Sequence, residues 1–308
     1  MFKKALKQTA LLLMTLILLA GIVLWTPDKS RVELENAYGS SKNNYVTALG
    51  VKIRYQDTGP SQNPIPILFL HGFGSSLHTW DAWTKELGGE YRVISVDLPG
   101  FGLTGEDPSG IYTDQRSVEV LEAFLKELNI PKVVMVGNSM GGKLAWQFAA
   151  QYPWQVSKLV LISPDGYSSP GAEYGKKTEI PAIANLYRYF FSKSFLAINL
   201  EPAYADPHTL NDALVNRYYD FMLAPGVRGA ILARMQQTVL QDPVPSLMKI
   251  QVPTLLMWGE KDAFIPLSNS EDYLRVMPHA KRVTLPNIGH LPQEEQANVG
   301  LQALKEFL

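Results

Sequence analysis

The chain has no cysteine among its 308 residues. Disulfides, thiolate metal sites and lipid attachment through cysteine are therefore excluded. Neither sign of charge predominates. The chain has 28 lysines and arginines and 29 aspartates and glutamates, which gives a formal net charge of −1. There is no internal repeat, low-complexity tract or block of like charge. This balance gives no indication of a nucleic-acid partner.

One long apolar run is present, over residues 10–25, after a start that carries Lys3, Lys4 and Lys7. As a helix it would span about 24 Å, against about 30 Å for the hydrocarbon core of a bilayer. Gln8, Thr9 and Thr26 extend it to a marginal span. We expect residues 1–27 to form an uncleaved anchor in the bacterial inner membrane, followed by a polar linker over residues 28–44. The lysines would stay in the cytoplasm and the rest of the chain on the periplasmic side. The alternative is a cleaved signal peptide and a secreted protein, but no Ala-x-Ala site follows the run.

The most informative motif is Gly137-Asn138-Ser139-Met140-Gly141, which fits G-x-S-x-G. It follows the apolar residues 133–136 and precedes a helical pattern over residues 143–150. The two glycines allow a tight strand-to-helix turn with the serine exposed at its tip. Ser139 is therefore the candidate nucleophile. The alternative is an ordinary glycine-rich turn, so the partners of the serine must decide.

A serine hydroxyl needs a histidine to accept its proton, and the histidine needs a carboxylate to orient it. In hydrolases with this turn the chain order is serine, acid, histidine. Among the histidines after Ser139, His290 lies in a loop with glycine and proline after a predicted strand, where catalytic side chains concentrate. His279 follows a predicted helix, and His208 lies in a polar turn. His290 is the candidate base.

The acid is expected just after a strand. Asp262 follows the predicted strand 254–258 and is the candidate; Glu260 and Asp165 are its competitors. An oxyanion hole also requires two backbone N–H groups. We assign these to Met140, directly after the nucleophile, and to Phe73 in the loop His71-Gly72-Phe73-Gly74. His71 precedes the serine and is expected to shape this loop instead of acting as the base.

Predicted strands recur at residues 67–70, 92–96, 133–136, 159–162, 254–258 and 282–285, after a hairpin around Gly50. Helical patterns lie between most of them, which predicts an α/β fold with a mostly parallel sheet and helices on both faces. We expect core segments over residues 45–165 and 246–308. Between them, residues 166–245 are rich in large apolar side chains without a convincing strand and predict an inserted helical cap. Arg188, Arg217, Arg228 and Arg234 are candidates there for an anionic substrate group, or else surface charges.

The motifs around Ser139, His71, Asp97, Asp262 and His290, in this order, resemble those of the α/β-hydrolase superfamily over about residues 45–308. Within it the chain resembles bacterial capped lipases and carboxylesterases and, less closely, hydrolases that cleave carbon–carbon bonds in meta-cleavage products. The second group typically has a tryptophan after the catalytic histidine, where this chain has Leu291. Members of the superfamily that form an alkyl-enzyme carry aspartate in place of Ser139, so the serine argues against that chemistry.

The resemblance implies a serine hydrolase for carboxylic esters with an apolar part, acting through an acyl-enzyme and Ser139, Asp262 and His290. This chemistry requires no metal or organic cofactor. The alternatives are hydrolysis of a carbon–carbon bond in a dienoate and, last, an inactive hydrolase fold that only binds.

Overall fold

The structure is a computed structural model that describes residues 2–39, 43–62, 65–168, 173–177 and 179–308. Its centre is an eight-stranded sheet with the order β1-β2-β4-β3-β5-β6-β7-β8. Only the β1–β2 and β2–β4 pairs are antiparallel, which confirms the expected mostly parallel sheet. The strands are β1 Asn43–Ala48, β2 Val51–Thr58, β3 Ile67–Leu70, β4 Val93–Val96, β5 Val133–Asn138, β6 Val156–Ile162, β7 Thr254–Gly259 and β8 Lys281–Leu285.

Each central strand supplies side chains to two hydrophobic cores, one on each face of the sheet. In β3, Leu68 and Leu70 belong to one core, whereas Ile67 and Phe69 belong to the other. This alternation follows from the two-residue period of a strand. Strands buried on both faces read as continuous apolar runs, which is why they were recognisable in the sequence.

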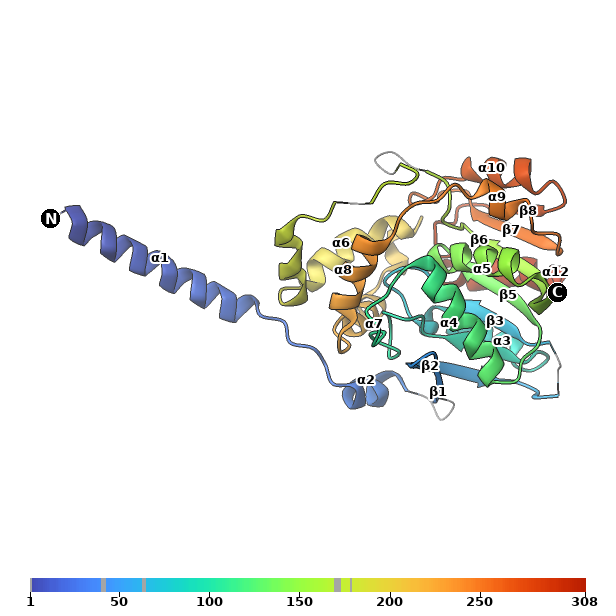
Figure 1. Ribbon diagram of the computed structural model, residues 1–308, viewed down its shortest axis with the longest axis horizontal. Helices are drawn as coiled ribbons and strands as arrows, with labels where there is room; N and C mark the ends of the chain where they lie inside the picture. The colour runs from blue at the N-terminus through green and yellow to red at the C-terminus, as the bar shows by residue number, and fades with distance from the viewer. Residues whose placement is uncertain (1, 40–42, 63–64, 169–172, 178) are drawn as a thin grey trace.

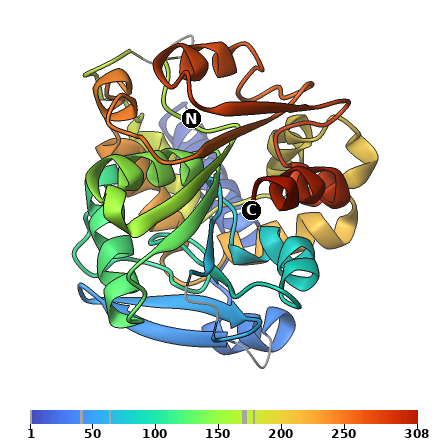
Figure 2. The ribbon, with the colours of Figure 1, turned by 90° about the vertical axis from the view of Figure 1, so that its right-hand side faces the viewer.

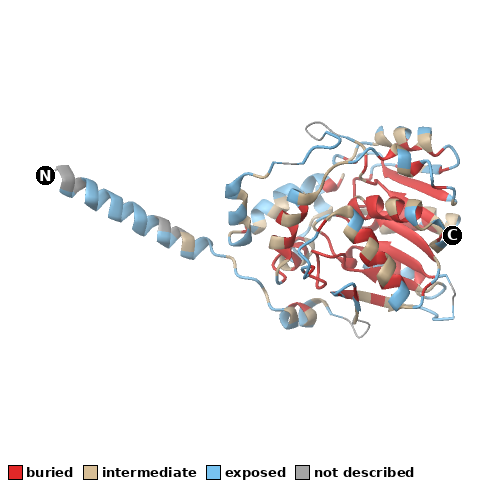
Figure 3. Ribbon diagram, in the orientation of Figure 1, coloured by how far each residue is buried: buried red, intermediate tan, exposed pale blue. Residues whose placement is uncertain are grey.

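Helices cover both faces of the sheet (Figure 2). α4 and α5 pack on one face of the sheet, while α3 and α12 pack on the other through Trp83, Leu301 and Leu304. The helices of the core are η1 Leu77–Trp80, α3 Asp81–Leu87, α4 Asp114–Glu127, α5 Met140–Gln151, η2 Pro153–Gln155, α10 Asn269–Val276, α11 Pro292–Glu295 and α12 Ala297–Phe307. Figure 3 shows the buried residues concentrated in the strands between these layers.

The chain between β6 and β7, residues 163–253, is called the helical insertion here. Its described residues form helices and one isolated bridge between Lys177 and Val239. The helices are η3 Ala182–Arg188, α6 Lys193–Leu200, η4 Glu201–Ala203, η5 Pro207–Thr209, α7 Asp212–Met222, α8 Val227–Gln237 and α9 Val244–Leu247. In Figure 1, α6, α7 and α8 lie together on the side of the sheet that faces α1.

The N-terminal helix α1, Phe2–Leu24, projects away from the rest of the protein (Figure 1). Its segment Leu6–Leu24 is long and apolar enough to cross a membrane, and it is not buried against the protein. A second helix, α2 Arg31–Tyr38, follows within the stretch expected as a linker. Ser30 caps it by accepting a hydrogen bond from the Glu33 N–H, and Leu34 is fully buried in the core. The polar composition of residues 28–44 predicted a linker, but part of this stretch forms a helix that packs on the core through Leu34.

Candidate active site

Ser139 sits in a sharp turn between β5 and α5. Its φ is +55° and its ψ is −120°, a combination that costs energy for a residue with a side chain. Close backbone approach explains the flanking glycines. A Cβ atom on Gly137 would lie 2.3 Å from the Gly141 carbonyl oxygen, and one on Gly141 would lie 2.3 Å from the Leu70 carbonyl oxygen. The strained turn therefore depends on both glycines and presents Ser139 at the end of β5.

His290 and Asp262 meet after the neighbouring strands β8 and β7. The Nδ1 atom of His290 lies 2.7 Å from Oδ2 of Asp262, and the Asp262 side chain is fully buried. The other carboxylate oxygen accepts hydrogen bonds from the Phe264 and Ile265 N–H groups, at 2.9 and 2.8 Å. With a proton on Nδ1 shared with Asp262, Nε2 is left as the acceptor.

The competing acids have other partners, and the competing histidines are exposed. Glu260 is exposed and accepts a hydrogen bond from the Asn287 N–H. Asp165 pairs with Lys143, and its side chain is 42% exposed. His208 and His279 are exposed. Of the described acids and histidines, Asp262 and His290 are thus the pair that the structure joins after two adjacent strands.

Asn138, which the sequence analysis did not single out, ties these parts together. Its Nδ2 group donates to the carbonyl oxygens of Ile162 and His290, at 3.2 and 3.1 Å. The His290 N–H donates to the Ala203 carbonyl oxygen at 2.7 Å, which links the same loop to the helical insertion. A polar residue at the end of an otherwise apolar strand was the only signal for Asn138. The described residues contain no hydrogen bond from the Ser139 hydroxyl to His290.

The loop after β3 lies against Ser139. A Cβ atom on Gly72 would lie 3.3 Å from the Ser139 Cβ atom. Within the described chain, the N–H groups of Phe73 and Met140 donate no hydrogen bond, so both are available to a ligand oxygen. Met140 is the first residue of α5, where helix N–H groups lack partners within the helix.

His71 has the loop-shaping contacts expected of it. Its Nδ1 atom lies 2.7 Å from the Gly72 carbonyl oxygen, and its Nε2 atom accepts a hydrogen bond from the Leu98 N–H at 3.0 Å. These contacts require a neutral ring with the proton on Nδ1. Complete burial lowers the pKa of this imidazole, against the opposing effect of the Asp97 carboxylate.

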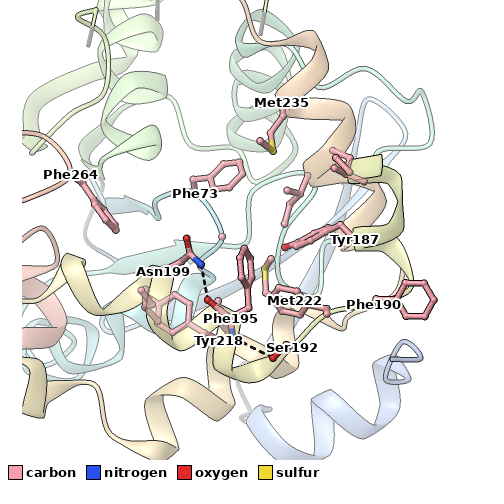
Figure 4. A pocket seen from close by; sticks show the side chains of 17 residues that line it. Phe73, Tyr187, Phe190, Ser192, Phe195, Asn199, Tyr218, Met222, Met235 and Phe264 are labelled. Carbon is pink, nitrogen blue, oxygen red and sulfur yellow. Dashed lines mark hydrogen bonds between the residues drawn. The ribbon is translucent and has the colours of Figure 1, made fainter. Parts of the chain in front are cut away.

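Two cavities meet at the site. The smaller, of about 300 Å³, is lined by Ser139 and Met140 together with polar side chains, among them Lys143 and Arg234. The larger, of about 810 Å³, is lined almost wholly by apolar and aromatic side chains of the helical insertion. Phe73 and Met235 line both cavities. Figure 4 shows them projecting toward the same space from the loop after β3 and from α8.

Several of the large apolar side chains of the helical insertion line the larger cavity: Tyr187, Phe190, Phe191, Phe195, Leu200, Tyr218 and Met222. Phe264, from the loop after β7, also lines it, and its ring lies 5.3 Å from the His290 ring. The apolar cavity therefore reaches the candidate base.

The four candidate arginines have different surroundings. Arg188 is exposed, whereas Arg217 forms an ion pair with Glu294, which also accepts hydrogen bonds from Tyr204 and Tyr218. Arg228 pairs with Asp28 at 2.6 Å. The expectation of surface charges is therefore wrong for Arg217 and Arg228, and it is also wrong for Arg234, which is buried.

Arg234 is the member of this set that lines the cavity of Ser139. Its Nη2 group donates to the Pro99 carbonyl oxygen and to the Ser117 hydroxyl. Its Nε and Nη1 atoms are buried and make no hydrogen bond with the described residues. Lys143 is buried nearby between Asp114 and Asp165, at 2.9 and 3.4 Å. Burial acts to lower the pKa of Lys143, but the two carboxylates outweigh it and raise the pKa.

Residues 65–297 match the family described as the alpha/beta hydrolase fold. The chain belongs to this family. It is 29% identical over 290 residues to the 2-hydroxy-6-oxo-6-(2'-aminophenyl)hexa-2,4-dienoic acid hydrolase of Metapseudomonas resinovorans, which covers 91% of this chain and 96% of that protein. The fold is also similar to a thermophilic esterase from Thermogutta terrifontis, with 26% identity, a TM-score of 0.71 and coverage of 87% and 98% of the two chains.

The structure of a membrane phospholipase A, described as a bacterial virulence factor, is similar over 98% of this chain and 97% of its own. Its TM-score is 0.74 and its identity 24%, so this likeness shows the fold alone. The proteins similar to this chain therefore include one named as a hydrolase of a dienoic acid and one named as an esterase, and the choice between these reactions depends on the site.

Proposed function

We propose that the protein is a serine hydrolase that cleaves carboxylic esters with an apolar acyl or alcohol part. Ser139 attacks the ester carbonyl, and His290 accepts its proton through Nε2. Asp262 orients His290 and stabilises the imidazolium. The Phe73 and Met140 N–H groups bind the oxyanion. The observation that carries the proposal is the hydrogen bond of 2.7 Å between His290 and Asp262 beside the strained turn that presents Ser139.

The reaction balances in two steps. The Ser139 oxygen forms a bond to the carbonyl carbon, and the bond to the alkoxy group breaks as His290 returns the proton to the leaving alcohol. In the second step His290 takes a proton from water, and the water oxygen forms a bond to the acyl carbon. The bond between that carbon and the Ser139 oxygen then breaks, and His290 returns the proton to Ser139 as the acid leaves. A hydrogen bond from Ser139 to His290 would form when substrate binds, because catalytic contacts often tighten only in the complex.

The cavities favour an ester with two unlike halves. The larger cavity has the composition of an acyl-chain site, while Ser139 itself lines the smaller, more polar cavity. Binding sites with apolar walls and a few convergent polar groups are typical for small organic ligands. Attachment through α1 to the inner membrane, with the hydrolase on the periplasmic side, completes the proposal; secretion after cleavage of this segment is the alternative.

Ser139→Ala tests the reaction directly. Turnover of p-nitrophenyl butyrate should fall by about 10⁶. Ser163→Ala is a matched control, because Ser163 also lies at a strand end with a positive φ, but it is buried and its hydroxyl has no hydrogen-bond partner among the described residues. The control should keep most of the activity. Unchanged turnover in Ser139→Ala would contradict the proposal.

Carbon–carbon bond hydrolysis of a dienoate is the second candidate. Two observations favour it: relatives named as hydrolases of dienoates, and Arg234 beside the cavity of Ser139. A substrate carboxylate would reach the buried Nε and Nη1 atoms only after a small shift of the arginine side chain. Leu291, in the position after His290, argues against this candidate. A panel of p-nitrophenyl esters of graded acyl length, together with one coloured dienoate, distinguishes the two reactions. Ester hydrolysis raises the absorbance of p-nitrophenol, whereas carbon–carbon bond hydrolysis lowers the absorbance of the dienoate.

A further inference from the structure

The helical insertion exposes a group of large apolar side chains close together in the chain. Ile183, Leu186 and Tyr189 lie in and directly after η3, and Phe195 and Ile198 lie in α6. Their exposed fractions range from 46% for Tyr189 to 73% for Ile183. We call these five residues the apolar face. Single exposed apolar residues are ordinary on soluble proteins, but a group of them marks a contact surface.

The N-terminal helix ends beside this face. Trp25, directly after α1, stacks on Tyr189 with ring centroids 5.3 Å apart and an interplanar angle of 20°. It also lies 6.4 Å from the Phe190 ring in an edge-on arrangement. The Thr26 N–H donates to the Tyr189 carbonyl oxygen at 2.8 Å. The end of α1 and the apolar face are therefore held together by direct contacts.

The segment after Trp25 is fixed to the insertion by further bonds. Arg228 donates to the Thr26 carbonyl oxygen at 2.7 Å and pairs with Asp28 at 2.6 Å. Lys29 pairs with Asp220 of α7 at 3.0 Å. Because Arg228 is buried, loss of Asp28 would leave a desolvated cation, which disfavours detachment of this segment. The described residues 25–29, which directly follow α1, are thus held on the helical insertion by direct contacts.

This attachment determines what covers the apolar face. A helix that crosses a bilayer ends in the interfacial region, where tryptophan and tyrosine are preferred. With α1 in the membrane, Trp25 and Tyr189 lie in that region, and the rest of the face lies next to it. The partner that fits the face is therefore a lipid surface.

The apolar face also borders the larger cavity. Phe195 belongs to both, and its neighbours Leu196, Asn199 and Leu200 in α6 line the cavity while Ile198 is exposed. Phe190, which contacts Trp25, lines the cavity as well (Figure 4). A chain leaving the bilayer at this face would meet the cavity wall directly.

We propose that the apolar face rests on the phospholipid bilayer that holds α1, and that the larger cavity takes the apolar chain of the substrate from that bilayer. The second part rests on the proposed ester hydrolysis; the first part does not. The substrate class that follows is an ester dissolved in the membrane, presented with its apolar chain toward α6.

The cysteine-free chain allows a direct test of the contact. Full-length Ile183→Cys and Ile198→Cys proteins, labelled with an environment-sensitive nitrobenzoxadiazole dye, are placed in phospholipid nanodiscs. Trp154→Cys and Met248→Cys are matched controls, because both residues are apolar, more than 60% exposed and near the amino-terminal ends of β6 and β7. Lipids carrying a nitroxide should quench the dye at 183 and 198 but not at 154 or 248. Equal quenching at all four positions, or none at 183 and 198, overturns the proposal.

A kinetic test addresses the route of the substrate. The double variant Ile183→Glu and Ile198→Glu is made in the full-length protein and placed in vesicles. Its rate of hydrolysis of bilayer-dissolved p-nitrophenyl palmitate should fall about tenfold or more. Hydrolysis of soluble p-nitrophenyl butyrate should stay unchanged, because neither isoleucine lines the cavity. Trp154→Glu should change neither rate. Equal effects on the two substrates, or no effect, overturn the route. If the unmodified protein hydrolyses neither ester, the proposed function fails, and the labelling result still decides the contact.

Discussion

The Nδ1 atom of His290 lies 2.7 Å from the Oδ2 atom of Asp262, although the two residues come from loops after different strands. Backbone bonds hold these loops together, since the Lys261 N–H donates to the Ile288 carbonyl oxygen at 2.9 Å. Gly259 permits the approach, because a Cβ atom there would lie 2.0 Å from the Gly289 carbonyl oxygen. These backbone contacts between the two loops thus bring Asp262 and His290 together.

Asp262→Asn should keep the shape of this pair but lose the charge that stabilises the imidazolium and the proton arrangement on His290. We expect kcat for p-nitrophenyl butyrate to fall by about 10⁴. Glu260→Gln, on the same loop and exposed, should stay within about twofold of the unmodified enzyme. Steady-state kinetics of the two variants checks this assignment, and a larger loss in Glu260→Gln would reverse it.

Met235→Trp should change chain-length preference. Met235 lines both cavities, so the larger side chain of tryptophan at this position would narrow the passage between Ser139 and the apolar cavity. We expect KM for p-nitrophenyl palmitate to rise about tenfold, with little change for p-nitrophenyl acetate. Met248→Trp is the control, because Met248 is exposed outside both cavities. Equal loss toward long and short esters would show that the passage does not carry the acyl chain.

His71 should make folding stability depend on pH. Burial lowers its pKa below the ordinary value of 6.5, so the unfolded chain binds more protons than the folded protein once the pH falls below that value. The contribution of the neutral ring is complete above the ordinary value and is lost as the pH falls toward the lowered pKa. In denaturant titrations from about pH 7.5 to about pH 5.5, the free energy of unfolding should fall less for His71→Gln than for the unmodified protein. Identical pH dependence in both proteins would contradict this.

Much of the fold follows from local patterns in the sequence. The strand expected over residues 67–70 is observed as β3, and the others differ from expectation by a few residues at their ends. Continuous apolar runs are typical of strands buried on both faces, and glycine fixes the turn around Ser139. These features depend on residues adjacent in the chain, which is why they could be predicted.

Other features depend on contacts between distant residues. Asn138 is linked to His290 across 152 positions, and Thr26 to Phe191 across 165. The composition around Asp28 is that of a solvated linker, yet Leu34 is fully buried and Asp28 pairs with Arg228. No local pattern reveals that a charged residue has a partner so far along the chain. The ion pair between Arg217 and Glu294 was missed for the same reason.

Covalent labelling tests directly whether Ser139 is the nucleophile. Full-length protein is treated with a fluorophosphonate, digested, and sequenced by tandem mass spectrometry. We expect one adduct, on Ser139, which forms in parallel with the loss of p-nitrophenyl butyrate hydrolysis and forms much more slowly in His290→Ala. An adduct on another serine, or complete inhibition without modification of Ser139, would contradict this assignment.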